Sequence, residues 1–159
     1  MNLRVTSAKL TGNPSASGWV QIHEFQDPNT TGAGGQLYLV VTVENSSDVE
    51  KIAKGREIAN KIFEDFYSKS EESAFNSLQE SVGGALKDFT DEFEKIEIVA
   101  VSLTGNTLYV VISGGGSAIL YRDGIIAKIL VGSEGLTSAS GYPKEGDVFI
   151  LATSKFTKV

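Results

Sequence analysis

The sequence predicts an α+β domain, in which two long helices lie on the faces of largely antiparallel sheets. Two observations carry this prediction. Apolar segments of strand type come first, two long segments with helical periodicity follow, and strand-type segments fill the rest of the chain. In addition, Asp123-Gly124 stands between two alternating segments, which is a strong hairpin signal. A length of 159 residues fits one domain that buries a core without disulfides.

Two strands are predicted before the first helix. The segment from Trp19 to Phe25 alternates, with Val20 and Ile22 on one side, as in a half-buried strand. Residues Asp27 to Gly35 concentrate Pro, Asn and Gly and predict a solvated loop. The segment from Leu37 to Val43 is apolar and β-branched throughout, which predicts a central strand.

Two amphipathic helices should follow. The capping-box pattern Ser47-Asp48-Val49-Glu50 marks the start of the first helix. Its apolar stripe consists of Val49, Ile52, Ala53, Ala59, Ile62, Phe63, Phe66 and Tyr67. After a polar hinge over Ser68 to Ser73, the second stripe consists of Phe75, Leu78, Val82, Ala85, Leu86, Phe89 and Phe93. Gly83-Gly84 weakens the second helix by about 1 kcal/mol per Gly relative to Ala and predicts a kink or a close helix crossing.

The C-terminal half predicts strands. Turns at Thr104-Gly105-Asn106 and at Asp123-Gly124 should close two successive hairpins that form a meander. The strands concerned are Ile96 to Leu103, Thr107 to Ser113, Ser117 to Arg122 and Ile125 to Val131. Gly132 to Gly146 is rich in Gly and Ser and predicts a loop, and Val148 to Ala152 predicts one more buried strand.

The composition limits the kinds of partner that the chain could bind and bears on the compartment in which it works. Fourteen basic and twenty acidic residues give a net charge of −6 without a basic stripe, which argues against nucleic acid and against an anionic membrane surface. No segment approaches the roughly 20 apolar residues that span a bilayer. The absence of cysteine is compatible with a reducing cytoplasm, where we expect this chain to work, and it excludes thiolate metal sites.

Three segments carry a resemblance to a known family. LYVVISGGGSAILYRDG (Leu108 to Gly124) resembles the strand, Gly-Asp-Ser, strand, Arg-Asp-Gly hairpin of the metal-dependent type-2C serine/threonine phosphatases. EGDVFILATSKF (Glu145 to Phe156) resembles that family's Gly-Asp-Val, apolar strand, Thr-Asp-Gly segment. LYLVVTVENSSDVEKIAKGREIANKIFEDF (Leu37 to Phe66) resembles its strand, Asp-Gly metal motif and following helix.

This resemblance implies a type-2C phosphatase-like β-sandwich of mainly antiparallel sheets, flanked by antiparallel helices. The family continues beyond Thr-Asp-Gly into another helix and a closing strand with an Asp-Asn motif, for which the sequence up to Val159 has no counterpart. We therefore expect residues 1–159 to be a single phosphatase-like domain, truncated at its C-terminus and part of a longer chain.

At the family's metal-associated aspartates, this sequence has other residues. Gly115 stands at the Asp of Gly-Asp-Ser, Ser154 at the Asp of Thr-Asp-Gly, and Val43 within Thr42-Val43-Glu44 at the Asp-Gly motif. A binuclear Mg²⁺ or Mn²⁺ centre concentrates about four positive charges within roughly 4 Å and needs carboxylate oxygens. The substitutions predict no metal cofactor and no metal-bound hydroxide, so we assign no catalytic residue and no defined binding residue.

Three functions remain open from the sequence. The first is a catalytically inactive phosphatase-like domain, a pseudophosphatase, with a binding or regulatory role toward an unidentified protein partner. The second is a divergent metal-dependent phosphoprotein phosphatase that uses Glu44 and Asp48 as replacement ligands for Mg²⁺ or Mn²⁺. Against this, Asp48 suits a helix start and Glu44 a solvated loop. The third is a structural assembly module whose exposed sheet edge pairs with another chain. The sequence specifies no oligomeric state.

Four further features have a structural interpretation. Asp123 and Asp147 fall at predicted turns rather than at ligand positions. His23, the single histidine, cannot form a metal cluster or a triad alone and is expected to be a partly buried or surface strand residue. Gly114-Gly115-Gly116 lacks the helix start and the Lys of a P-loop, so it predicts a bulge or tight bend rather than a phosphate cradle.

Overall fold

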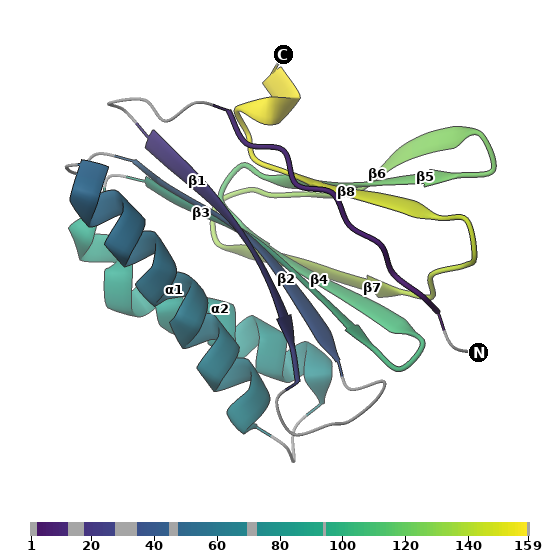
Figure 1. Ribbon diagram of the computed structural model, residues 1–159, viewed down its shortest axis with the longest axis horizontal. Coiled ribbons are helices and arrows are strands. Elements are labelled where there is room, and N and C mark those ends of the chain that lie inside the picture. The colour runs from purple at the N-terminus through teal and green to yellow at the C-terminus, as the bar shows by residue number, and fades with distance from the viewer. Residues whose placement is uncertain are drawn as a thin grey trace.

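The computed structural model describes residues 3–12, 18–27, 35–44, 48–69, 73–93 and 95–158. Figure 1 shows the arrangement of its elements. The helices and strands, in chain order, are β1 Gly18–Gln26, β2 Gln36–Glu44, α1 Asp48–Ser68, α2 Ala74–Phe89, β3 Lys95–Thr104, β4 Thr107–Ser113, β5 Ser117–Arg122, β6 Ile125–Val131, β7 Leu136–Gly141 and β8 Val148–Ala152. Short 3₁₀ turns occupy Thr90–Glu92 and Phe156–Lys158.

The strands form two antiparallel sheets. The larger sheet has the order β1-β2-β3-β4-β7 and the smaller one the order β6-β5-β8. Helices α1 and α2 cover one face of the larger sheet, and the smaller sheet lies on its other side (Figure 1). This arrangement confirms the predicted α+β class and the antiparallel β-sandwich.

Alternation along the central strands of the larger sheet divides the interior into two cores. Odd positions of β2, such as Leu39 and Val41, join the core beneath the helices, together with Ile58 and Leu78 of α1 and α2. Val40 belongs to the core between the two sheets. Because both faces of the larger sheet are buried, its central strands read as continuous apolar segments. The inter-sheet core consists of Val40, Val99, Val101, Leu108, Val110, Ile112 and Ala118.

Both predicted helices are present. Helix α1 begins at Asp48, whereas the other partners of the predicted capping box, Ser47 and the side chain of Glu50, lie outside the described residues. Helix α2 is capped by Ser73, whose Oγ accepts a hydrogen bond from the amide of Asn76 at 3.2 Å. This helix ends at Phe89, so Phe93 lies beyond it in extended backbone and still packs against the helix-side core.

The predicted loop over Gly132 to Gly146 is wrong in its middle. Leu136–Gly141 forms β7, which pairs antiparallel with β4 at the edge of the larger sheet. The segment reads LTSASG, whose small polar residues give no apolar alternation, and its pairing depends on the exposed edge of β4. Of the predicted loop over Asp27 to Gly35, residues 28–34 lie outside the described residues.

Both predicted hairpins form, but they do not make a meander. β3 pairs with β4, and β5 pairs with β6 through Asp123 and Gly124, which have φ of 52° and 80°. However, β4 and β5 belong to different sheets, because the chain crosses between the sheets at Gly114 to Gly116. Gly114 has φ of +81°, and a Cβ on Gly116 would lie 2.6 Å from Cγ2 of Val99. The predicted tight bend is therefore confirmed, and glycine is required there.

The smaller sheet leaves apolar side chains at the surface. Ile126 of β6 is 72% exposed, whereas Ile98, in the larger sheet, is fully buried. Other exposed apolar residues of this sheet are Tyr121, Ile125, Val131, Val148 and Ile150. None of the helices in the described part of the chain has the length and apolarity needed to cross a membrane.

The contrast between these two isoleucines gives a stability test. We expect Ile98→Ala to lower the free energy of unfolding by about 2–5 kcal/mol, because it opens a cavity in the helix-side core. Ile126→Ala should change it by less than about 0.5 kcal/mol, because that side chain already contacts water. Urea denaturation of both variants measures the difference, and equal losses would contradict the assignment of the core.

Candidate functional site

Three residues singled out in the sequence, Glu44, Gly115 and Ser154, lie at one end of the sandwich. There β2 and β3 pair in a register that places Glu44 opposite Lys95 and Thr42 opposite Glu97. Alternation along each strand turns these four side chains away from the helices, toward the inter-sheet side. The chain leaving β8 at Ser154 reaches the same end, so elements distant in sequence meet there.

Glu97 is the centre of this cluster. Glu97 is only 2% exposed, and both of its carboxylate oxygens accept hydrogen bonds. The amide of Ser154 donates to Oε2 at 3.0 Å, and the hydroxyl of Ser154 donates to Oε1. The ammonium of Lys95 lies 2.8 Å from Oε1 and 3.4 Å from Oγ of Ser154. We call Lys95, Glu97 and Ser154 the carboxylate lock, because they join β3 of the larger sheet to the end of β8 in the smaller one.

The contacts within the carboxylate lock favour the ionised forms of Glu97 and Lys95. Burial by itself raises the pKa of the Glu97 carboxyl, but Lys95 and the two hydrogen bonds from Ser154 outweigh burial and lower this pKa below its ordinary value. The hydrogen bond to Glu97 raises the pKa of Lys95 against the opposing effect of its own partial burial. At neutral pH the pair is therefore a carboxylate and an ammonium.

A second ion pair lies beside the lock. The ammonium of Lys155 is 2.9 Å from Oε1 of Glu44, with side-chain exposures of 53% and 23%. Since solvent screens this pair, its contribution to stability is small. Lys95, Glu97, Glu44 and Lys155 together sum to zero charge, so the cluster is electrically balanced by its own side chains.

The three positions aligned with family aspartates are placed differently. A Cβ on Gly115 would lie 3.0 Å from Cβ of Ser154 and 3.5 Å from Oε1 of Glu97, so positions 115 and 154 meet at the lock. Val43 instead packs in the helix-side core, 1% exposed, on the opposite face of the sheet. Asp48 is the first residue of α1, and its side chain lies outside the described part.

These residues do not fit a binuclear metal centre. Such a centre needs several free carboxylates, whereas both oxygens of Glu97 are already taken by donors and Glu44 is paired with Lys155. Among the described residues there is no group of three or more His, Cys, Asp and Glu side chains that could hold a metal ion. Moreover, the ammonium groups of Lys95 and Lys155 would repel a divalent cation.

One buried polar atom of this cluster is unsatisfied. Oγ1 of Thr42 has no hydrogen-bond partner among the residues that the structure describes, although the residue is only 3% exposed. Thr42 stands directly across from Glu97 in the β2–β3 register, on the same face of the sheet. An oxygen without a partner is costly in the interior, so Thr42 is an exception among the buried polar groups of this cluster.

Lys95 and Glu97 were not among the candidates drawn from the sequence. One signal was available: Glu97 interrupts the apolar segment IEIVAV, where it stands between Ile96 and Ile98. An acidic residue in such a position must have a partner. The identity of that partner, Ser154, could not be read from the strand pattern.

The remaining sequence candidates have structural roles. Asp147 precedes β8, and its two carboxylate oxygens accept hydrogen bonds from Nε and Nη2 of Arg122 at 2.8 and 2.6 Å. Asp123 forms the β5–β6 turn. His23 is half-buried in β1, where its Nε2 lies 2.9 Å from Oε1 of Gln21. Burial, with smaller effects of Lys9 and Arg56, lowers the pKa of His23.

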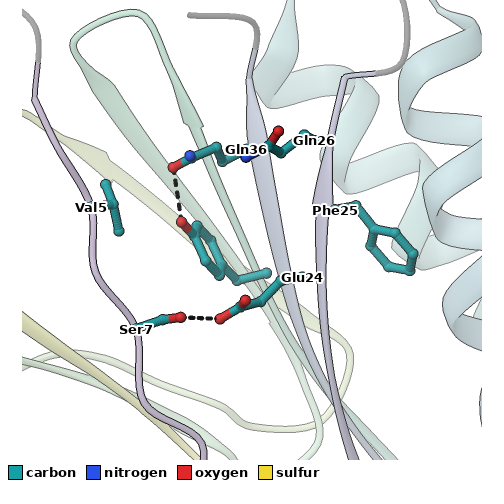
Figure 2. A pocket seen from close by; sticks show the side chains of 7 residues that line it. Val5, Ser7, Glu24, Phe25, Gln26 and Gln36 are labelled. Carbon is teal, nitrogen blue, oxygen red and sulfur yellow. Dashed lines mark hydrogen bonds between the residues drawn. The ribbon is translucent and has the colours of Figure 1, made fainter.

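A separate polar pocket of about 290 Å³ lies between the N-terminal segment and strands β1 and β2. Figure 2 shows Ser7 and Glu24 pointing toward one another across it, joined by a hydrogen bond. The hydroxyl of Tyr38 donates to Oε1 of Gln36 at 2.8 Å on the same side. The hydrogen bond between Ser7 and Glu24 thus joins the N-terminal segment to β1.

Comparison with known proteins agrees with this architecture. No family model and no curated protein matches the sequence. Solved structures do match. One is PppA, a key regulatory component of the type VI secretion system (T6SS) in Pseudomonas aeruginosa, with a TM-score of 0.62 and 12% identity over 89% of this chain and 79% of that one. The serine/threonine phosphatase of S. agalactiae matches with a TM-score of 0.60 and 12% identity, over 93% of this chain and 77% of that one.

A third match is the phosphatase domain of the cell fate determinant SpoIIE from Bacillus subtilis, with a TM-score of 0.56 and 13% identity over 88% of this chain. The chain has the fold of a type-2C phosphatase domain. It spans 60% of the length of the SpoIIE domain. At these identities the phosphatase-like fold is what the likeness establishes.

The lock predicts a specific pH dependence. Because the folded-state pKa of Glu97 lies below its unfolded value of about 4.3, the stability that it contributes is complete above that value and is lost as the pH falls through the folded pKa. Glu97→Gln should lower the free energy of unfolding by about 2–3 kcal/mol at pH 7, since it removes a charged acceptor of three donors.

This deficit should shrink in acid, where the wild-type carboxyl is protonated as well. Urea denaturation at neutral and at acidic pH measures it. Glu44→Gln, in the exposed pair, is the control and should cost less than about 1 kcal/mol. A Glu97→Gln deficit that stayed constant or widened in acid would contradict the ionised lock.

Proposed function

We propose that this chain is a catalytically inactive phosphatase-like domain that acts by binding a protein partner in a regulatory role. The observation that carries the proposal is the carboxylate lock. At the end of the sandwich where the family-aligned positions Gly115 and Ser154 meet, Glu97 is engaged by Lys95 and Ser154 rather than left free for a metal ion. The family's hydrolysis depends on a metal-bound water, for which this cluster offers no suitable ligand set.

The cluster also offers no metal-free nucleophile of ordinary strength. Ser154 donates its hydroxyl hydrogen bond to Glu97, which superficially resembles a serine paired with a base. The pKa of Glu97 is lowered, however, so its carboxylate is a weak base and does not activate the hydroxyl. In addition, Ser154 is buried, 7% exposed, which leaves its oxygen little access to a phosphoryl group.

The binding role is supported by what the chain retains. The chain keeps both hydrophobic cores and the helix layer, and its backbone matches that of PppA with a TM-score of 0.62. The exposed apolar side chains of the smaller sheet, such as Ile126 and Val148, and the net charge of −6 suit a protein partner better than a polyanion. One structure with this fold, PppA, is described as a key regulatory component, which supports a regulatory role by analogy alone.

Metal titration tests the proposal directly. We expect isothermal titration of the wild-type chain with Mn²⁺ to show no tight binding of two ions, because Glu97 and Glu44 are already paired with Lys95 and Lys155. Turnover of p-nitrophenyl phosphate should be the same with Mn²⁺ and with a chelator. Tight binding of two ions together with metal-dependent turnover would overturn the proposal.

The alternative, a divergent phosphatase, predicts the opposite effect of substitutions at Glu44 and Asp48. If Glu44 and Asp48 were replacement ligands, Glu44→Ala and Asp48→Ala would abolish Mn²⁺-dependent turnover. We expect both variants to match the wild type in background turnover, since the Glu44 carboxylate serves Lys155. Lys128 is exposed on β6, so Lys128→Ala serves as a control for differences in turnover that arise from preparing a variant protein.

A further inference from the structure

We propose that the ammonium of Lys95 is a built-in cation that fills a latent cation site formed by Glu97, Ser154 and Thr42. In this arrangement the chain supplies its own positive charge, and Lys95 is the residue that keeps metal ions out. The inference rests on the proposed function, in that the wild-type chain is taken to bind no metal at the lock.

The oxygen atoms around Lys95 have the character of a small cation site. Its Nζ lies 2.8 Å from Oε1 of Glu97 and 3.4 Å from Oγ of Ser154. An ammonium is a compact point charge with three donors and no acceptor, so it can occupy a place among oxygen ligands as a metal ion would. The same Glu97 oxygen also accepts from the Ser154 hydroxyl, which holds the two ligands in contact.

Thr42 supplies an independent observation. Its Oγ1 is buried and has no hydrogen-bond partner within the described ranges, and it faces the same side of the sheet as Glu97 from the neighbouring strand. A hydroxyl oxygen left unpaired beside a buried carboxylate is a further potential ligand for a cation or for its bound water. Thr42 therefore adds a further hydroxyl on the face of the sheet that carries Glu97.

A carboxylate side chain is easier to add at position 154 than at position 115, because position 115 has less room. A Cβ on Gly115 would lie 3.0 Å from Cβ of Ser154, so a side chain there needs Ser154 to shift. Ser154 already points at Glu97 and Lys95, and an aspartate in its place would bring a second carboxylate to the same point. With Lys95 present, that carboxylate gains an ammonium partner, and with Lys95 absent it can gain only an external cation.

Lys155 is the matched control for this role. It is also a lysine at the same end of the sandwich, and its side chain is 53% exposed against 42% for Lys95, but its partner is Glu44, which is less buried than Glu97. Removing it takes away one surface ion pair and leaves the contacts of Glu97 in place. A general effect of losing one positive charge near the site would thus appear equally in Lys95→Met and Lys155→Met.

The experiment compares four variants by thermal unfolding with and without millimolar MnCl₂, alongside isothermal titration. We expect Mn²⁺ to raise the Tm of Lys95→Met/Ser154→Asp by at least about 3 °C and to bind it one to one. Lys95→Met alone should show a smaller rise. Ser154→Asp with Lys95 retained, and Lys155→Met, should show none.

The outcomes separate the two proposals. If Lys95→Met/Ser154→Asp is folded by near-ultraviolet circular dichroism and Mn²⁺ neither binds it nor raises its Tm, the latent cation site is wrong, as it is if Ser154→Asp binds Mn²⁺ equally well. If the double variant is unfolded without metal, folding on addition of Mn²⁺ supports the site, and otherwise the response of Lys95→Met decides. Two-ion binding with turnover in the wild-type chain would instead overturn the proposed function.

Discussion

The burial of the Glu97 carboxylate is the constraint on which this end of the molecule depends. A buried charge is tolerated only where a counter-charge and hydrogen bonds replace its water. Here the counter-charge comes from Lys95, two residues away on the same strand, and the hydrogen bonds come from Ser154, 57 residues later. The contacts that satisfy this one carboxylate therefore constrain where the chain passes after β8, and they add a polar connection to the apolar core between the two sheets.

The same constraint links fold and function. In a metal-dependent site, carboxylates gathered at a sheet edge repel one another until an external ion neutralises them. In this chain the gathered charges already balance, with Glu97 against Lys95 and Glu44 against Lys155. At this end of the fold, the chain's own side chains therefore neutralise the buried charge and also connect the two sheets.

Much of the fold could be predicted from sequence because local signals agree with the tertiary environment. Leu37 to Val43 is apolar throughout since both faces of β2 are buried, and Asp123-Gly124 has the positive φ angles that a hairpin turn needs. β7 was missed because an edge strand of small polar residues owes its structure to β4 rather than to its own composition. The glycines at the crossing predict a bend, but they do not indicate that the chain passes there into a second sheet.

The site was less accessible for a different reason. The family resemblance of short segments points to positions 43, 115 and 154, but whether they converge depends on the strand pleat and on the crossing between sheets. Glu44 faces the inter-sheet side, and Val43 is the residue before it. Because side chains alternate along a strand, the side chain of Val43 therefore lies in the helix-side core. Lys95 and Glu97 occupy no position that the resemblance marks, because they lie in β3, a strand on which none of the three marked positions falls. The buried carboxylate at this end of the sandwich is therefore best understood from the residues that satisfy its charge, and here these are a lysine and a serine.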